Sequence, residues 1–597
     1  MTSDSDQNSN QVKVTDQAPN QITRRSLLGG VAAAGSAIAG LSMTACAPAA
    51  LDKKDRFDSE FDVVCVGAGA AGMMAAVTAV HEGASVVVLE KAPVAGGTTA
   101  KSGAVFWIPN HFGLKARGIE DNRDDCIRFL CRYAFPTIYN PHARYFGVPE
   151  FDYERLAAFY DNGSQAVDFI REVGAFKLRE WRMWDLDIPA PDYLEYVPEN
   201  KTSTGRPLAA IDDEGTFCWG WGMISQMGSF LAERNVQVKT EHAVRELIMD
   251  DQGGVRGVVV EYGDELLRIK ANKGVIFGTG GYAHNVDLIN RFQDVFAYGS
   301  CAQQSAQGDF IGISSAANAM LGNMQGAWRT AVVLEQALEN RAVGTGMFVP
   351  PGDAMLLVNR YGKRFVNEHR NYNDRSRSHA TFDPSIGDFP NHLQFMIYDH
   401  RTATIVTDNG QPPIDPAETY VISAPTLRDL AVAIASRIKA LSDRIGGYTL
   451  DSRFAENLEE TVERFNGYAV AGKDSDFARG DHEYDKQWHK VWGAFAFTEA
   501  YPENPYPNKT LHPLAKEGPY YAVILAPGVL DTNGGPMTDA NAQVVDVNYR
   551  PIKGLYGAGN CICAPTRNAY AGAGGTIGPA LTYGFIAARH ALASTAS

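Results

Sequence analysis

Residues 61–91 read FDVVCVGAGAAGMMAAVTAVHEGASVVVLEK, and this stretch decides the fold. The apolar, β-branched run at 61–66 predicts a buried parallel strand that leads directly into the glycine turn GAGAAG at 67–72. A helix-forming run and a second strand follow, and this strand ends at Glu90, 23 residues after the first glycine. Here the glycines let the backbone approach a pyrophosphate at a helix N-terminus, and the Glu90 carboxylate can bind a pair of ribose hydroxyls. The stretch predicts a dinucleotide-binding α/β domain; the alternative is a tight turn without a ligand.

Three further segments indicate which dinucleotide binds. Residues 96–103 (GGTTAKSG) place glycines and hydroxyls close behind the acid, which resembles FAD enzymes in which the chain continues along the ribityl chain and flavin. Residues 274–281 (GVIFGTGG) form another strand and glycine turn after a β-meander predicted over 255–271, as in a glutathione-reductase-like FAD domain. Residues 554–560 (GLYGAGN) supply a last strand, with Asn560 where many flavoproteins have Asp. The predicted cofactor is FAD, and no metal site is predicted.

This resemblance assigns the cofactor contacts to the glycine turns, the acid and the residues that follow them. The residues expected at the cofactor are Gly67, Gly69, Ala70, Ala71, Gly72, Glu90, Lys91, Gly96, Gly97, Thr98, Thr99, Ser102, Gly103, Ala243, Gly280, Gly559, Asn560, Thr576 and Ile577.

The order of these segments predicts an α/β fold, a split glutathione-reductase-like (Rossmann-type) FAD domain with an inserted α+β catalytic or cap domain. An export signal over 1–46 and a linker over 47–56 would precede the FAD domain, whose two segments, 57–332 and 533–597, would flank the cap at 333–532. Residues 358–368 (VNRYGKRFVNE) predict a hairpin that opens the insertion. The substrate is expected at the seam between the domains, where clefts concentrate.

Composition excludes several classes of protein. At 597 residues, with 45% hydrophobic and 21% charged residues, the chain is globular and long enough for two or more domains. Its formal net charge of −15 argues against nucleic acid or an anionic membrane as the main partner. Eight cysteines are too few for a disulfide scaffold, and the absence of C-x-x-C-H and H-E-x-x-H motifs argues against attached haem and the commonest zinc hydrolases.

The N-terminal residues predict a targeting signal. Arg24-Arg25 precedes an apolar, small-residue stretch that runs to Ala45, which resembles a twin-arginine signal for the export of folded proteins. The alternative is an ordinary secretory signal that contains two arginines by chance. Residues 43–46 (MTAC) also resemble a lipobox with Cys46 as a lipid anchor, although residues 47–49 offer a rival cleavage site. The expected partner is the twin-arginine export machinery, and the expected location is the periplasm of a bacterium or, with a lipid anchor, its membrane.

Three motifs resemble a superfamily that contains fumarate reductase flavoproteins, urocanate reductases and 3-ketosteroid dehydrogenases. They are GGTTAKSG at 96–103, GKRFVNE at 362–368 and GLYGAGN at 554–560. Fumarate reductases have a proton-donating arginine where this chain has Tyr372, and a His pair near the stretch VLDTNGG at 529–535. They also bind the substrate carboxylate with an arginine before a Leu-Gly-Gly step, which this chain lacks. All three departures resemble the 3-ketosteroid Δ1-dehydrogenases instead.

The resemblance to Δ1-dehydrogenases implies roles for individual residues. Tyr372 matches the base, and Tyr570 with the Gly574 N–H matches the pair that holds the ketone oxygen. A helper tyrosine matches Tyr196, although Tyr193 can be aligned there instead. Each of these tyrosines could also be structural, since the chain has 25. Ala571 stands where the family usually has Pro.

The implied reaction introduces a C=C bond next to a ketone by α-proton abstraction and hydride transfer to flavin N5. Its partners would be a steroid-like cyclic ketone and a quinone or other electron acceptor. Glycines near residue 574 would bring the backbone close to the carbonyl, and the helix that starts near Thr576 would direct its positive end at the flavin. Two alternatives remain open: an exported reductase of the fumarate or urocanate kind, and a non-catalytic flavoprotein. Cys561 and Cys563 are interpreted as buried packing residues.

Overall fold

The computed structural model describes residues 56–184, 186–404, 415–495 and 503–594. The described residues from Arg56 onward belong to one compact unit. The predicted export signal at 1–46, with Cys46, and nearly all of the predicted linker lie outside the described residues. Within the described ranges, no helix combines the length and the apolar character needed to cross a bilayer.

An eight-stranded sheet forms the base of the FAD domain. Its strands run in the order β18-β19-β9-β1-β2-β6, and the β7–β8 hairpin extends from β9. β1 pairs in parallel with β2 and β9, which agrees with the strand–turn–helix–strand unit expected from the glycine motif. The strands are β1 (Ser59–Val66), β2 (Val86–Leu89), β6 (Gln237–Lys239), β7 (Ala243–Met249), β8 (Val255–Tyr262), β9 (Glu265–Phe277), β18 (Gln543–Val545) and β19 (Pro551–Gly557).

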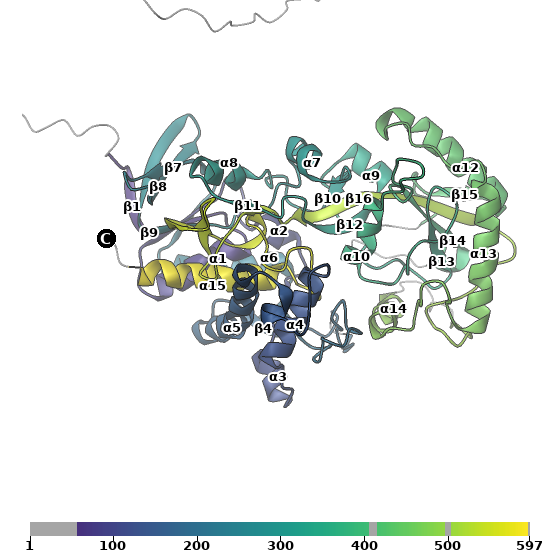
Figure 1. Cartoon of the computed structure of the whole chain (residues 1–597), viewed down its shortest axis with the longest axis horizontal. Coiled ribbons are helices and arrows are strands. Elements are labelled where there is room, and N and C mark those ends of the chain that lie inside the picture. The colour runs from purple at the N-terminus through teal and green to yellow at the C-terminus, as the bar shows by residue number, and fades with distance from the viewer. Residues whose placement is uncertain (1–55, 185, 405–414, 496–502, 595–597) are drawn as a thin grey trace, which may run out of the picture. The chain divides into compact units, whose positions relative to one another are not determined.

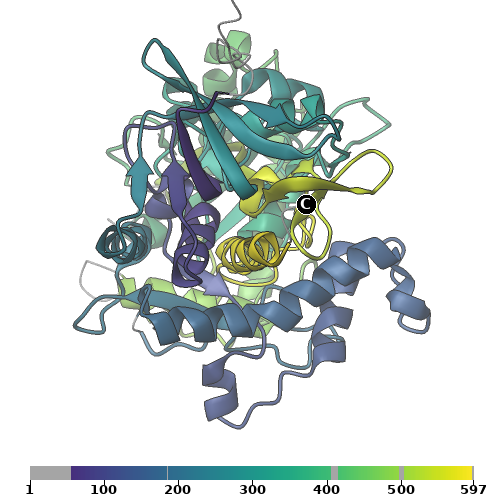
Figure 2. The same cartoon turned by 90° about the vertical axis from the view of Figure 1, so that its left-hand side faces the viewer.

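Two helices from opposite ends of the chain lie side by side against this sheet. They are α1 (Ala70–His81) and α15 (Ile577–Ala593), which Figure 2 shows in purple and yellow. α5 (Glu150–Val173) packs across α15, and α6 (Trp219–Glu233) contacts both α1 and α2 (Gly97–Lys101). The start of α1 depends on glycine, because a Cβ at Gly72 would lie 1.9 Å from the Gly67 carbonyl oxygen. The split FAD domain therefore closes through α15, at the end of the chain.

A six-stranded sheet organises the inserted region of the chain. Its long strand β16 (Tyr520–Thr532) pairs with β12 (Ala327–Val333), β14 (Gln394–Asp399), β15 (Ile422–Ala424) and β10 (Gly299–Ser300), and β13 (Met355–Val358) pairs with β14. Figure 1 shows α12 (Leu427–Ala440) and α13 (Phe454–Ala471) over this sheet, where their apolar faces complete a buried core. This sheet already begins at β10, upstream of residue 333.

The hairpin predicted over 358–368 does not form. β13 ends at Val358 and pairs with β14, while residues 363–368 form a loop rather than a strand. A turn does occur where it was expected, since the Gly362 N–H donates to the Asn359 carbonyl (2.9 Å). The reason for the loop is that Arg364 and Glu368 are drawn into a buried network of ion pairs, described below.

Shorter elements complete the fold. β3 (Val105–Trp107), β5 (Pro207–Ile211) and β4 (Lys177–Glu180) form a three-stranded sheet, and β11 (Leu321–Gly322) pairs with β17 (Gly535–Pro536). The remaining α-helices are α3 (Phe112–Ala116), α4 (Arg123–Ala134), α7 (Val286–Phe292), α8 (Asp309–Ala316), α9 (Leu334–Glu339), α10 (Tyr372–Ser376), α11 (His400–Ala403) and α14 (Glu483–Phe495).

Candidate active site

A cleft with an empty volume of about 1020 Å³ lies where β1, β2 and β9 end and α1 and α15 begin. Most of the residues expected at the cofactor line it. These are Gly67, Gly69, Ala70, Ala71, Glu90, Lys91, Gly97, Thr98, Thr99, Ser102, Gly280, Gly559, Asn560, Thr576 and Ile577.

Four of the expected cofactor residues are not in the cleft wall. Gly72 and Gly96 shape the backbone behind it, because a Cβ at Gly72 would strike Gly67 and Gly96 has a φ of +115°. Gly103 lies one residue beyond the lining Ser102. Ala243 is buried between His242 and Val244, which do line the cleft.

The cleft residues fit a dinucleotide. The Glu90 carboxylate is fixed at the end of β2 by the N–H groups of Ala68 (2.9 Å) and Ala92 (2.8 Å), and it retains further acceptor capacity for ribose hydroxyls. The N-cap residue of α1 is Gly69, which has no side chain to cap the helix, although the Ala70 N–H donates to Thr99 Oγ1 (3.1 Å). A Cβ at Gly67 would lie 2.6 Å from the Gly278 carbonyl oxygen, so this turn accepts only glycine. Uncapped N–H groups at a helix start are suited to a diphosphate.

Two acids in the cleft wall were not predicted. Asp309 forms an ion pair with Lys91, which brings the start of α8 to the end of β2. Asp531, near the end of β16, accepts from the Gly281 N–H (2.9 Å) and from Asn560 Nδ2 (3.2 Å). Burial raises the pKa of Asp531 to about 6. Both reach the cleft from elements distant in sequence, and only the VLDTNGG stretch carried any signal for Asp531.

Three tyrosine rings meet in one buried cluster between the FAD domain and the insertion. Ring centroids lie 5.4 Å apart for Tyr372 and Tyr570, 5.5 Å for Tyr193 and Tyr372, and 5.3 Å for Tyr193 and Tyr570. The Tyr372 hydroxyl lies close enough to the hydroxyls of the other two tyrosines to interact with them. Trp328, whose ring is 5.3 Å from that of Tyr570, donates through Nε1 to Asn560 Oδ1 (3.0 Å) and so connects the cluster to the cofactor cleft.

Electrostatics keep the cluster protonated. Burial raises the pKa of Tyr372 well above its usual value, and Tyr193 and Tyr570 raise it further. Burial also raises the pKa values of Tyr193 and Tyr570, but the nearby Tyr372 hydroxyl opposes this. The resting cluster therefore holds Tyr372 as the phenol, and its phenolate, once formed, is a strong base.

The backbone at Gly574 lies next to the tyrosine cluster. Gly574 has a φ of +84°, and a Cβ there would lie 2.3 Å from the Val105 carbonyl oxygen. Among the residues that the structure describes, its N–H has no hydrogen-bond acceptor. The next residue, Gly575, touches the Tyr570 ring, since a Cβ at Gly575 would lie 3.0 Å from Tyr570 Cδ1. A free N–H thus lies beside the tyrosine cluster.

The structure does not bring Tyr196 to this cluster. Its side chain is 51% exposed and stacks on His482 at 4.3 Å between ring centroids, under the guanidinium of Arg370. Tyr193, which is 1% exposed, occupies the place expected of the helper. The backbone decides between them: the Tyr193 N–H donates to the Ala571 carbonyl (2.9 Å), and its own carbonyl accepts from Arg370 Nη2 (2.5 Å).

Arg370 holds the Tyr193 segment to the insertion. Its guanidinium bonds Glu195 (3.1 Å) and Asp485 (3.1 Å) as well as the Tyr193 carbonyl, and Asp485 belongs to α14. On the other side, the buried Asp192 accepts from Trp107 Nε1 (2.7 Å) and pairs with Arg206. Tyr193 is fixed from both sides.

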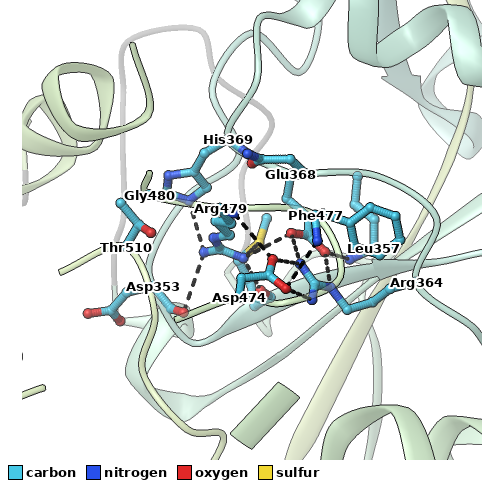
Figure 3. A network of polar contacts seen from close by, with 12 residues as sticks. Asp353, Leu357, Arg364, Glu368, His369, Asp474, Phe477, Arg479, Gly480 and Thr510 are labelled. Carbon is cyan, nitrogen blue, oxygen red and sulfur yellow. Dashed lines mark hydrogen bonds and ion pairs between the residues drawn. The ribbon is translucent and has the colours of Figure 1, made fainter. Parts of the chain in front are cut away.

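A second charge network, shown in Figure 3, fixes the loop that precedes Tyr372. Glu368 is fully buried and accepts two bonds of 2.8 Å from Arg364, which also bonds Asp474 at 2.8 Å. Arg479 approaches Glu368 at 3.3 Å and donates to the Met355 carbonyl (2.7 Å). This network ends four residues before Tyr372, the first residue of α10. The arrangement ties the position of Tyr372 to β13.

Cysteines and metal ligands add no further chemistry to this site. All seven described cysteines are unpaired and buried, including Cys561 and Cys563. Burial raises the pKa of Cys561 to about 11, so its thiol stays protonated. In the described ranges, no three His, Cys, Asp or Glu side chains are grouped to hold a metal ion.

Comparison with known proteins agrees with this geometry. A family model described as "FAD binding domain" matches residues 62–577. The chain is 30% identical to a 4-oxocyclohexanecarboxylate 2-dehydrogenase of Sinomonas cyclohexanicum over 89% of this chain and 92% of that protein. It is 29% identical to a 3-oxosteroid 1-dehydrogenase of Mycolicibacterium smegmatis over 90% and 98%. The solved 3-ketosteroid Δ1-dehydrogenase of Sterolibacterium denitrificans, in complex with 1,4-androstadiene-3,17-dione, superposes with a TM-score of 0.73 at 25% identity, covering 90% of this chain and all of that one.

Proposed function

Since the chain belongs to the FAD-binding-domain family of flavoenzymes, we propose that its tyrosine cluster dehydrogenates the carbons next to a ring ketone. FAD, when bound, supplies the two-electron acceptor for the hydride that leaves the β-carbon. The observation that carries the proposal is the convergence of the Tyr193, Tyr372 and Tyr570 hydroxyls with the free N–H of Gly574.

Tyr570 and Gly574 supply the two donors that a reacting ketone needs. An α-proton beside a ketone is weakly acidic, and it becomes removable only if negative charge on the oxygen is stabilised as the proton leaves. The Tyr570 hydroxyl and the Gly574 N–H would bind this oxygen as an oxyanion hole does, and one such donor is worth about 3–4 kcal/mol in the transition state. The Gly574 N–H is free for this because no group of the described chain accepts from it.

Tyr372 would take the α-proton. Its raised pKa makes the phenolate a strong base but also means that the resting site holds the phenol. Tyr193, within hydrogen-bond reach, can turn its hydroxyl to donate to the Tyr372 oxygen once that oxygen is charged. Because the phenolate fraction grows as the pH rises, dehydrogenation should become faster toward alkaline pH.

The substrate class follows from the surroundings of the cluster. The tyrosines belong to an apolar core that also contains Trp328, Tyr484 and Trp488, which suits a ring ketone with a largely apolar body. The relatives named above act, by their names, on a cyclohexanone carboxylate and on 3-oxosteroids. A cyclic 3-ketosteroid or a substituted cyclohexanone is accordingly the proposed substrate, with a quinone-like electron acceptor.

The test is anaerobic reduction of the holoenzyme. A saturated 3-ketosteroid and 4-oxocyclohexanecarboxylate are mixed separately with the oxidised protein, and bleaching of the flavin band is followed. We expect bleaching by one of them and a product with a new C=C bond next to the ketone. Lack of bleaching by either, together with reoxidation of the dithionite-reduced protein by an enone or an unsaturated acid, would contradict the proposed direction.

The N-terminal residues carry the proposal for where the protein is located. The Arg24-Arg25 signal supports export by the twin-arginine route to the periplasm, with Cys46 as the candidate lipid anchor. Replacing both arginines by lysine should leave FAD-loaded protein in the cytoplasm, and Cys46→Ser should release exported protein from the membrane fraction. Periplasmic protein after the arginine replacement would refute the twin-arginine route, and a membrane fraction unchanged by Cys46→Ser would refute the lipid anchor.

A further inference from the structure

An exposed aromatic surface lies at the start of α6, beside the cofactor cleft. Trp219 is 42% exposed and Trp221 is 65% exposed, although their neighbours Cys218, Gly220 and Gly222 are buried. The Trp219 ring packs edge-on against Phe217, with 4.9 Å between centroids. A single exposed tryptophan is ordinary, but two within three residues form a large apolar surface that the described chain leaves uncovered.

The backbone between the two tryptophans touches the wall of the cofactor cleft. The Gly220 N–H donates to the Ser102 carbonyl (2.8 Å), and a Cβ at Gly220 would lie only 1.8 Å from the Thr99 carbonyl oxygen. Thr99 and Ser102 line the cleft. One layer of backbone therefore separates this surface from the cofactor site, and the labels α2 and α6 are adjacent in Figure 1.

The conformation of Trp219 directs its side chain outward. Its φ of +57° is a left-handed value that bulky residues rarely adopt. This turn at the first residue of α6 leaves Cys218 and Gly220 buried and the indole in solvent. The strain alone does not identify a function, because Tyr549 has a similar φ of +59° in a remote turn. Trp219 differs from Tyr549 because its neighbour Gly220 contacts Ser102 and Thr99 in the wall of the cofactor cleft.

The charges nearby disfavour an anionic partner. Asp212, Asp213 and Glu214 occupy the loop that leads to Phe217, and the whole chain is acidic with a net charge of −15. Asp213 is paired with Lys177 (2.7 Å), but Glu214 is exposed. An anionic acceptor would be repelled here. A flat, neutral ring system can instead stack on indole faces.

We infer that Trp219 and Trp221 form the docking surface for an uncharged quinone that reoxidises the enzyme. The inference rests on the proposed function, in which dehydrogenation releases two electrons and two protons for each C=C bond formed. The quinone takes up both electrons and both protons and becomes the hydroquinone, so atoms and electrons balance. The Gly220 contact with Ser102 and Thr99 brings the docked ring close to the cofactor site.

The experiment isolates reoxidation from reduction. The holoenzyme is reduced anaerobically with dithionite and mixed with menadione, and recovery of the oxidised flavin band is timed. We expect Trp219→Ala and Trp221→Ala each to lower the second-order rate constant about tenfold, the loss of one aromatic contact, while Trp219→Phe retains most of it. Ferricyanide, which is anionic and not planar, should show little dependence on either tryptophan.

Tyr549→Ala is the matched control. Tyr549 is 49% exposed, has a positive φ and packs edge-on against Phe151 at 5.2 Å, but no residue of its turn lines the cleft. It should leave menadione reoxidation unchanged. The inference is overturned if both tryptophan variants reoxidise at the normal rate, or if they slow only reduction by the ketone, which would make the surface a substrate entrance. Because dithionite replaces the ketone, failure of the proposed substrate leaves this measurement intact.

Discussion

Tyr193 and Tyr196 are three residues apart, and replacing each by Phe gives the sharpest test of the site. In Tyr193→Phe the oxygen of Tyr372 loses a neighbour that can donate to it as it gains charge. A hydrogen bond to a charged group contributes about 1.5–3 kcal/mol. Since 1.36 kcal/mol corresponds to a factor of ten in rate, the reductive half-reaction should slow roughly 10- to 150-fold. Tyr196→Phe removes an exposed hydroxyl, and a change within about 0.5 kcal/mol predicts at most about a twofold effect.

The assay is stopped-flow bleaching of the flavin under anaerobic conditions at saturating ketone. Both variants should bind FAD normally, because neither tyrosine lines the cofactor cleft. With substrate deuterated at the α-carbon, Tyr193→Phe should keep or increase the isotope effect, which a purely structural defect would not do. Equal rates in the two variants, or a larger loss in Tyr196→Phe, would refute the placement of Tyr193 beside the base.

Three other changes test the scaffold. Glu368→Gln removes the carboxylate that pairs with the buried Arg479 and one of the two that pair with Arg364, so urea unfolding should show a loss of about 3–5 kcal/mol together with slower reduction; an unchanged midpoint would contradict the network of Figure 3. Gly574→Ala places a Cβ 2.3 Å from the Val105 carbonyl oxygen at a positive φ, so thermal unfolding should begin at a lower temperature; equal melting would show that the loop can shift. Burial lowers the pKa of the His111 imidazole to about 4. Between pH 6.5 and pH 4 the unfolded state therefore binds a proton at this imidazole that the folded state does not bind. About 3 kcal/mol of stability should be lost by pH 4 for this reason. His111→Asn keeps the cap acceptor for the Gly113 N–H (3.0 Å) without titrating and should flatten this dependence; an unchanged slope would assign it to other groups.

The cofactor side of the molecule was predictable because its signals are local. A glycine turn between a buried strand and a helix has few alternative conformations, and the Cβ clashes at Gly67 and Gly72 explain why glycine is required there. Asp309 and Asp531 were not predictable in the same way. Their side chains reach the cleft from α8 and β16, so their roles depend on how distant elements pack.

The inserted region was harder to predict because its determinants are buried charges. Residues 358–368 have the alternating pattern and the Tyr-Gly step of a hairpin, but Arg364 and Glu368 gain more from their ion pairs than from a strand ladder. The network joins two segments more than a hundred residues apart, and its four charged groups are Arg364, Glu368, Asp474 and Arg479. No local pattern of the sequence contains that information.

The choice between Tyr193 and Tyr196 depends on the backbone rather than on either side chain. Both tyrosines belong to one short turn-rich segment, and a rotation of that segment would exchange them. The segment is fixed because Ala571 accepts from the Tyr193 N–H and because Arg370 donates to the Tyr193 carbonyl. The first contact needs only a carbonyl at position 571, which Ala supplies as well as the Pro usual in the resembled family. Alanine at 571 therefore preserves the contact that holds Tyr193 beside Tyr372.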